Sequence, residues 1–177
     1  MLRPELVPKN CHYMAPRDFL GVKAWDFLRR HVYKRAGYLC EICKSPGRNE
    51  AHERYLIKND TMYLVRIVCL CPKCHEAIHL GLATLKGNQK RALAHMSKIN
   101  KLSPSECMDV YLEELEIYHS RWNVTKINYD MIYNDPVLSR VIQGLPLLPE
   151  HLSEISNKPT KASTPKIAKL GRVVKAG

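Results

Sequence analysis

The sequence has no long hydrophobic run and few acidic residues. No apolar run approaches the roughly 18 residues that a membrane-spanning helix needs, so we expect no contact with a membrane. Residues 1–20 contain neither a continuous apolar segment nor a small-residue cleavage site, which argues against a secretory signal and predicts a cytoplasmic protein. Hydrophobic residues make up 45% of the chain and charged residues 25%, a composition that excludes wholesale disorder.

The shortage of acidic residues leaves a strong positive charge. The 177 residues include 28 Lys and Arg against 17 Asp and Glu, a formal net charge of +11. Residues 23–48 hold seven basic and two acidic side chains, and residues 151–177 hold six and one, so each stretch contributes +5. Such a chain favours an anionic polymer as its partner, usually nucleic acid, although excess Lys and Arg can also serve solubility alone.

The cysteine pattern favours metal binding over disulfides. Seven cysteines are an odd number, which argues against a disulfide framework and for a reducing compartment. Four of them form two Cys-x-x-Cys pairs: Cys40, Cys43, Cys71 and Cys74. Two such pairs complete the closed shell of four thiolates that is typical of structural zinc. Two separate redox pairs are the weaker alternative, because no βαβ pattern surrounds either pair. The other three are predicted to be free thiols: Cys11, Cys69 and Cys107.

Periodicity and turn signals predict a small α+β domain. A helix is expected over residues 22–36, closed by Gly37, after an irregular arm over residues 1–21 that contains three prolines. Strands are expected over 50–57 and 62–70, joined at a Lys-Asn-Asp turn, and a helical turn over 75–80 follows. The two cysteine pairs bracket this order of strand, strand and helix.

The remainder of the chain favours helices and then a tail. Residues 89–100 are predicted to be a helix, and a capping box at 103–106 opens another that runs to about residue 122. We expect its apolar stripe to be core: Met108, Tyr111, Leu112, Leu115, Tyr118 and Trp122. Residues 124–133 are expected to form a short strand, and residues 136–177 a linker and a flexible basic tail.

The helix over residues 22–36 has two distinct faces. Its apolar stripe consists of Trp25, Leu28, Val32 and Ala36. A second face carries the basic side chains Lys23, Arg30 and Lys34. That basic face would lie along phosphates, or it would simply be solvated.

Histidines gather around the second cysteine pair. His75 and His79 stand at positions i and i+4 of the expected helical turn, on one face. Two imidazoles one turn apart can share a metal ion, and His52 lies on the facing strand within Glu50-Ala51-His52-Glu53. A third ligand from that strand would make a three-ligand site with open positions for water and a phosphate oxygen.

The stretch GYLCEICKSPGRNEAHERY, then the second strand, then LCPKCHEAIHLG resembles the four-cysteine branch of the HNH endonuclease family. The resemblance covers about residues 37–81. It implies a ββα-metal finger with two zinc knuckles, flanked by an N-terminal helix and C-terminal helices, and hydrolysis of phosphodiester bonds in DNA. The implied nuclease domain spans residues 22–84, with a helical extension over 85–135. Two alternatives are a catalytically inactive, zinc-stabilised nucleic-acid-binding protein and a protein-interaction module that uses helices 89–122.

The resemblance implies roles residue by residue. His75 matches the metal ligand of the family's helix, and His79 matches the additional histidine of metal-rich members. One alignment makes His52 a ligand and Glu53 the base; the other makes His52 the base and leaves Ala51 where a ligand should be. Neighbouring strand residues point to opposite faces, so both registers cannot hold. The expected catalytic residues are His52, Glu53, His75 and His79.

The implied cofactors are a structural zinc on the four cysteines and a catalytic divalent ion, Mg²⁺, Mn²⁺, Ni²⁺ or Zn²⁺, on His52, His75 and His79. Arg66 stands where the family has its middle Asn, and its guanidinium cannot replace the acceptor of an amide. Arg66 is predicted to contact nucleic acid together with Arg30 and Lys34. The remaining histidines are expected to have no special role: His12, His31, His95, His119 and His151.

Overall fold

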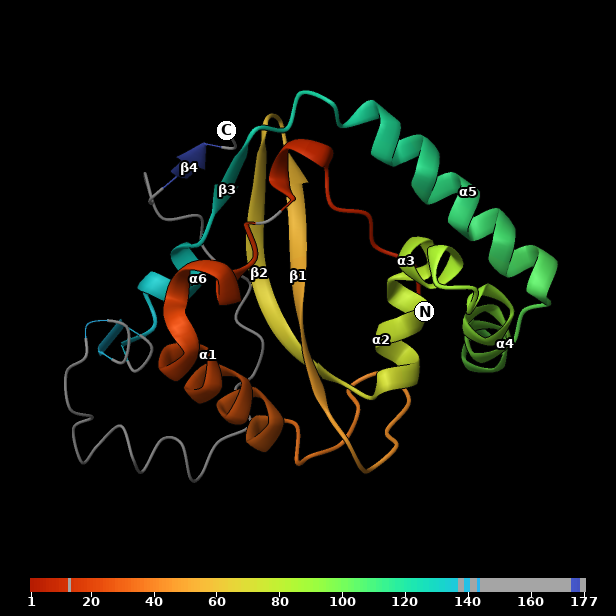
Figure 1. Cartoon of the computed structure of the whole chain (residues 1–177), viewed down its shortest axis with the longest axis horizontal. Helices are drawn as coiled ribbons and strands as arrows, with labels where there is room; N and C mark the ends of the chain where they lie inside the picture. Colours follow the sequence, from red (N-terminus) through yellow and green to blue (C-terminus); the bar gives the residue numbers. More distant parts are fainter. Residues whose placement is uncertain (13, 137–138, 141–142, 144–172, 176–177) are drawn as a thin grey trace.

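The computed structural model describes residues 1–12, 14–136, 139–140, 143 and 173–175, and Figure 1 shows their arrangement. The fold is mixed α+β, as predicted. Its helices are η1 (Lys9–Cys11), α1 (Pro16–Arg35), α2 (Pro72–Ile78), α3 (Leu80–Leu85), α4 (Gln89–Asn100), α5 (Pro104–Ser120) and α6 (Asp130–Tyr133). Its strands are β1 (Glu50–Lys58), β2 (Thr61–Leu70), β3 (Lys126–Asn128) and β4 (Val173–Lys175). Most of the predicted tail over 136–177 lies outside the described residues.

The hairpin of β1 and β2 is the centre of the molecule. The strands are antiparallel, with Glu50 opposite Leu70 and His52 opposite Val68. They agree with the predicted strands to within one residue at each end. The turn places Asn59 at a φ of 55°, a left-handed conformation that Asn tolerates better than most residues. β3 then pairs with β2 in parallel and with β4 in antiparallel orientation, in the order β1-β2-β3-β4.

The hairpin contains one bulge, which lies on β2, whereas the side chains of β1 alternate regularly between the two cores. Tyr55 pairs with Leu64 and Arg54 pairs with Arg66, so Val65 is an extra residue on β2. Such a bulge shifts the alternation of side chains along a strand. On β1, Ala51 and Tyr55 pack on the side of α1, whereas the buried His52 faces the opposite side.

α1 begins earlier than predicted. The irregular arm was expected to reach residue 21, and that expectation is wrong for residues 16–20, which are helical. Pro16 occupies the first turn, where its missing N–H costs nothing, and the Asp18 carboxylate accepts a hydrogen bond from the Ala15 N–H at 3.0 Å. Gly21 has a φ of 75° and a ψ of 162° and breaks the helix into two segments. The predicted helix from residue 22 is the second segment.

The helices after β2 follow the prediction in part. α2 begins inside the second cysteine pair, three residues before the expected start, and Cys71 caps it by accepting a hydrogen bond from the Cys74 N–H at 3.4 Å. His79 lies between α2 and α3, at a φ of −89° and a ψ of 45°. α4 has the predicted bounds, and α5 has the predicted capping box of Ser103 and Glu106.

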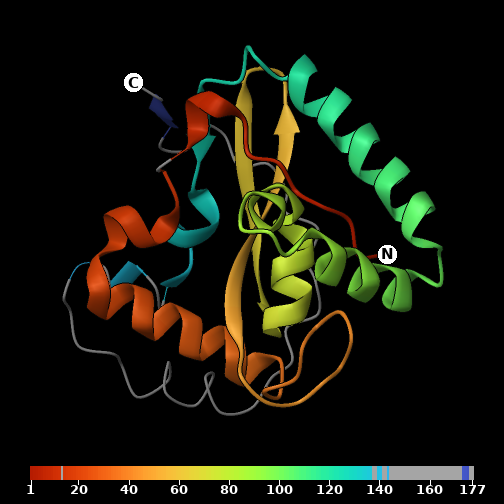
Figure 2. The same cartoon turned by 45° about the vertical axis from the view of Figure 1, so that its right-hand side comes forward.

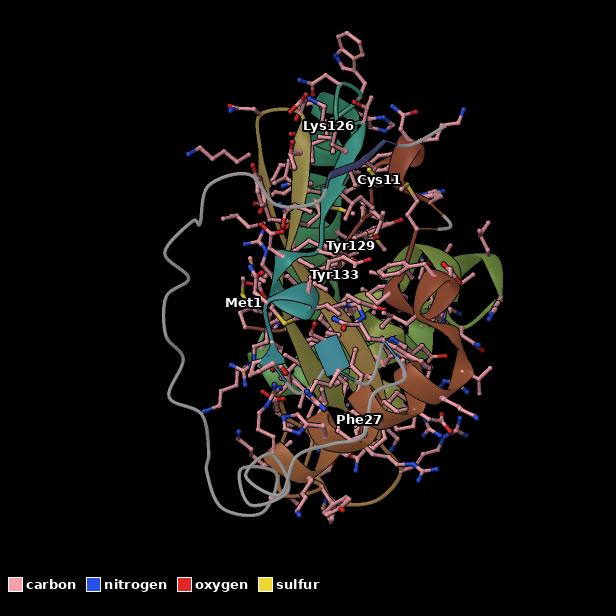
Figure 3. All side chains as sticks on the ribbon, turned by 90° about the vertical axis from the view of Figure 1, so that its left-hand side faces the viewer. Met1, Cys11, Phe27, Lys126, Tyr129 and Tyr133 are labelled. Carbon is pink, nitrogen blue, oxygen red and sulfur yellow. The ribbon has the colours of Figure 1, made fainter. Side chains whose placement is uncertain are left out.

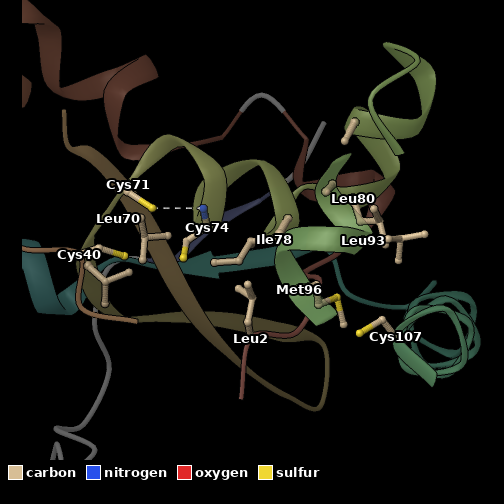
Figure 4. Packing of buried hydrophobic residues seen from close by; sticks show 14 residues of the cluster. Leu2, Cys40, Leu70, Cys71, Cys74, Ile78, Leu80, Leu93, Met96 and Cys107 are labelled. Atoms are coloured by element: carbon tan, nitrogen blue, oxygen red, sulfur yellow. Dashed lines mark hydrogen bonds between the residues drawn. The ribbon is translucent and has the colours of Figure 1, made fainter. Parts of the chain in front are cut away.

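Two buried cores lie on the two sides of the hairpin. One contains α2, α3 and α4 together with Leu2 and the cysteine pairs (Figure 4). The other joins α1, β2, β3 and α6 and includes Leu28 and Val32, as predicted. Figure 3 shows Tyr129 and Tyr133 at α6, where the Phe19 ring lies 4.7 and 6.5 Å from their ring centroids.

The prediction of a core stripe on α5 is confirmed only at its start, where Met108 and Tyr111 pack partly buried against the core beside α4. Cys107 is its one buried residue, whereas Leu112 is 50% exposed and the following Trp122 is 80% exposed. Figures 1 and 2 show α5 packed beside α4 and pointing away from the sheet. Helical periodicity shows that a helix is amphipathic, but it does not supply the element that covers its apolar face. No helix in the described ranges is long and apolar enough to cross a membrane.

Candidate metal centres

The four cysteines of the two Cys-x-x-Cys pairs come together in space. The Sγ atoms of Cys40, Cys43, Cys71 and Cys74 lie within 4.8 Å of one another. All four are free thiols, and Cys40 and Cys74 are fully buried (Figure 4). The loop that holds the first pair is tight: the Lys44 N–H donates to the Cys40 carbonyl at 2.9 Å, and Lys44 has a φ of 61°.

The electrostatics of this cluster suit a soft cation. Burial raises the pKa of Cys40 and Cys74 above the usual range of thiols. Burial acts the same way on Cys43, but hydrogen bonds with Ser45, Cys40 and Cys71 outweigh it and lower its pKa to about 6. Four thiolates this close repel one another unless a cation neutralises them, and zinc binds four-thiolate shells of this kind. The cluster therefore has the residues for a structural metal such as zinc.

His95 of α4 adds a contact that the sequence did not indicate. Its Nε2 lies 3.2 Å from the Cys74 Sγ. Cys74 is fully buried, so a hydrogen bond from an imidazole N–H would stabilise the thiolate form of its sulfur. The sequence predicts no special role for His95; the contact arises because α4 packs directly on α2.

The three histidines also come together. One ring nitrogen from each of His52, His75 and His79 lies within 4.8 Å of the others, and the ring centroids are 4.7 to 5.2 Å apart. His52 comes from β1, and the other two come from α2 and its C-terminal cap. The Nε2 atoms of His75 and His79 are 3.1 Å apart, a spacing that needs a proton or a cation between the two nitrogens.

The histidines are held neutral by burial. Burial lowers the pKa of His52 to about 4 and of His79 to about 3. It also lowers the pKa of His75, although the hydrogen bond that His75 donates to the Glu50 carboxylate opposes this shift. At neutral pH each imidazole therefore has one unprotonated nitrogen, which is the form that binds a metal ion. Three imidazole groups on facing elements are suitable ligands for zinc or nickel.

Two carboxylates contact the outer edges of this histidine cluster. The Glu50 Oε2 lies 2.5 Å from the His75 Nδ1, and the Glu5 Oε2 lies 3.0 Å from the His52 Nε2. The remaining nitrogen of His52, Nδ1, is buried and has no hydrogen-bond partner among the described residues. Buried polar atoms nearly always have a partner, so an unpartnered imidazole nitrogen beside two other histidines fits a metal ligand.

The other predicted site residues lie outside the two clusters. Glu53 sits between Ala51 and Tyr55 on the α1 side of the hairpin, and burial raises its pKa. Arg66 forms an ion pair with Glu41, whose carboxylate also binds Arg35 at 3.0 Å.

The two predicted cations of α1 line a groove. Arg30 pairs weakly with Asp26 at 3.6 Å, and Lys34 is exposed. The groove, of about 450 Å³, is lined by Lys23, Asp26, Phe27, Arg30, His31, Lys34 and Tyr38.

Glu50 and Glu5 contact the histidines but were not among the predicted site residues, and the sequence offers a signal for only one of them. Glu50 is two residues before His52, so strand alternation alone puts both on one face. Glu5 precedes His52 by 47 residues and lies in a segment without periodicity, so no local pattern indicates the contact.

Comparisons of the chain with family models, with curated proteins and with solved structures found no match. The assignment of function therefore depends on the residues themselves.

Proposed function

We propose that the protein is a metal-dependent endonuclease of the HNH type that hydrolyses phosphodiester bonds in DNA. The observation that carries the proposal is the meeting of His52 on the hairpin with His75 and His79 on the following helix, close to four clustered cysteines. The order β1, β2, α2 is that of a ββα-metal finger. The resemblance of residues 37–81 to HNH endonucleases supports the same activity.

Each cluster has a separate task in this proposal. The four cysteines would hold zinc and fix the start of α2, while the three histidines would hold a divalent ion. When bound, that ion would supply Lewis-acid stabilisation of charge on the phosphate oxygens and a water of lowered pKa. His75 and His79 are neutral at physiological pH because of burial, so they bind without first losing a proton. Glu50 fixes the ring of His75 through the hydrogen bond to its Nδ1.

The groove on α1 supports a nucleic-acid partner. Lys23, Arg30 and Lys34 outnumber the single acidic residue Asp26 along its walls, and the side chains of Phe27 and Tyr38 also line it. Cations bind phosphates and aromatic rings stack on bases, so the groove can contact a strand without reading its sequence.

A further cation lies nearer to the histidines. Arg17 is 68% exposed, and its charge contributes to the lowered pKa of His75 and His79. It is a second candidate for contact with phosphate.

A plasmid nicking assay tests the proposal. Zinc-loaded protein is incubated with supercoiled DNA and Mg²⁺, Mn²⁺, Ni²⁺ or added Zn²⁺, and nicked and linear products are separated on a gel. We expect cleavage by the wild-type chain, background levels with His75→Ala, and full cleavage with His119→Ala, which removes an exposed histidine of α5. Wild-type protein that leaves single- and double-stranded DNA and RNA intact with every ion would show that the proposal is wrong.

Two observations favour a second candidate, a zinc-stabilised nucleic-acid-binding protein without nuclease activity. Arg66, at the position of the family's middle Asn, is bound to Glu41. Glu53, at the base position of one alignment, faces the side of the hairpin away from the histidines. This candidate predicts salt-dependent binding of DNA that survives His52→Ala, together with no cleavage by the wild-type chain.

A further inference from the structure

The N-terminal segment reaches the histidine cluster from outside the finger. Figures 1 and 2 show it running from the side of α2 and α4 along the hairpin before the chain enters α1. Leu2 is fully buried, and its N–H and carbonyl both bond to the Asn100 side chain at 2.7 Å. The Glu5 N–H donates to the Ile78 carbonyl of α2 at 2.9 Å. The segment is therefore fixed to the helix that carries two of the three histidines.

The Glu5 carboxylate bridges two residues of β1. Its Oε2 lies 3.0 Å from the His52 Nε2, and its Oε1 forms an ion pair with Arg54. Arg54 stands two residues after His52, on the same face of the strand. An ionised carboxylate accepts hydrogen bonds and donates none, so its partner nitrogen on His52 must carry the hydrogen.

The hydrogen bond fixes the tautomer of His52. A neutral imidazole has one N–H and one lone pair, so a hydrogen on Nε2 leaves the lone pair on Nδ1. That Nδ1 is the buried nitrogen without a partner among the described residues. At His75 the pattern is reversed: Nδ1 contacts Glu50 at 2.5 Å, and Nε2 lies 3.1 Å from His79.

Glu5 itself lies outside the shell of potential ligands. Among the described residues, the groups whose ligand atoms all lie within 4.8 Å of one another are the three histidines and the four cysteines, and Glu5 is in neither. Glu5 contacts the histidine cluster through the ring of His52. Carboxylates that accept the outer N–H of a metal-binding histidine fix the ring and raise its affinity for the ion.

We infer that Glu5 is a positioning residue of the histidine metal site: it holds His52 with Nε2 protonated and directs Nδ1 to the ion. The inference rests on the proposed metal site and extends it to a segment outside residues 37–81. The site is complete only when residues 1–8 are docked on α2 and β1.

Nuclear magnetic resonance of the histidine rings tests the tautomer directly. The full chain, with zinc in the cysteine cluster, is titrated with further Zn²⁺, and long-range ¹H–¹⁵N spectra identify the protonated and the zinc-bound nitrogen of each ring. We expect His52 to bind through Nδ1 and His75 through Nε2. Binding of His52 through Nε2 would overturn the inference, because Glu5 would then have no N–H to accept.

Metal affinity supplies the second measurement. Glu5→Gln keeps the size of the side chain and removes its charge, and Glu5→Ala removes the contact. Both are expected to weaken zinc binding at the histidines by about 10- to 100-fold, measured by calorimetry, while one zinc per chain stays in the cysteine cluster. Glu113→Gln is the matched control, since Glu113 pairs with Arg3 of the same segment at 2.9 Å and does not contact the histidines.

The outcomes separate this inference from the proposed function. A wild-type chain that binds zinc only in the cysteine cluster would overturn both. A wild-type chain that binds a second ion with equal affinity in the Glu5 variants would overturn only the role of Glu5. Retention of the cysteine-bound zinc in each variant shows that the fold is intact, so loss of the second ion then reports on the histidine site.

Discussion

Removing one thiol from the cysteine cluster should cost far more stability than removing another buried thiol from the same core. The perturbation is Cys74→Ser, and its matched control is Cys107→Ser. Both sulfurs are fully buried and belong to the core beside α2 and α4 (Figure 4). Of these two cysteines, Cys74 alone belongs to the group of four thiols whose sulfurs lie within 4.8 Å of one another.

The expected magnitudes differ because only one variant affects metal binding. A hydroxyl buried in place of the Cys107 thiol should cost about 1–3 kcal/mol, which lowers the melting temperature by roughly 3–10 °C for a chain of this size. Structural zinc contributes about 10–16 kcal/mol in zinc-finger peptides, comparable with the whole stability of about 5–15 kcal/mol of a typical domain. Cys74→Ser should therefore lack both the zinc and a cooperative unfolding transition.

Two measurements on the purified proteins test the predicted difference between Cys74→Ser and Cys107→Ser. Zinc per chain is measured by elemental analysis, and thermal unfolding is followed by circular dichroism with and without a strong chelator. Chelation should destabilise the wild type and Cys107→Ser to the level of Cys74→Ser. Equal melting temperatures for the two serine variants, or one zinc per chain retained in Cys74→Ser, would refute the reasoning.

Three further predictions follow from the structure. Burial holds the pKa of His52 at about 4, against about 6.5 in an unfolded chain. Between these values the unfolded state binds the extra proton, so without metal on the histidines the contribution of His52 to the free energy of unfolding should fall by about 1 kcal/mol from pH 7 to 5.5. Denaturant titrations should show this contribution missing from His52→Gln, and a rise in stability on acidification would contradict it. For DNA binding, Arg30→Ala with Lys34→Ala should reduce the slope of log affinity against log salt by about 2. The exposed pair Lys58→Ala and Lys90→Ala should leave that slope unchanged; equal slopes for both double variants would argue against the α1 groove. Trp122→Ser should change stability by less than about 0.5 kcal/mol, whereas Met96→Ala should cost about 2–5 kcal/mol; a large loss with Trp122→Ser would mean that α5 is covered in solution.

Local sequence patterns identified the parts of both sites that come from neighbouring residues. The two Cys-x-x-Cys spacings, the i, i+4 histidines and the strand that carries His52 all lie within residues 40–79. A hairpin brings the two cysteine pairs together because Glu50 and Leu70 are opposite each other in its register. The capping box of Ser103 and Glu106 likewise fixed the start of α5.

The same patterns failed where a partner element had to be known. The prolines of residues 1–21 were interpreted as signs of irregular chain, but Pro16 begins a helix because its N–H is not needed there. The apolar stripe is predicted to be core along the whole of α5, but only its first turns pack against α4 and the core beside it.

The sequence by itself therefore determined the α+β class, the hairpin and the two groups of candidate metal ligands, because these depend on short spacings and periodicity. Only the tertiary structure decided what surrounds those groups. Docking of the N-terminal segment brings Glu5 to His52 across 47 residues, and packing of α4 on α2 brings His95 to Cys74 across 21. Such contacts depend on how elements distant in the sequence pack against one another, and no local sequence pattern predicts them.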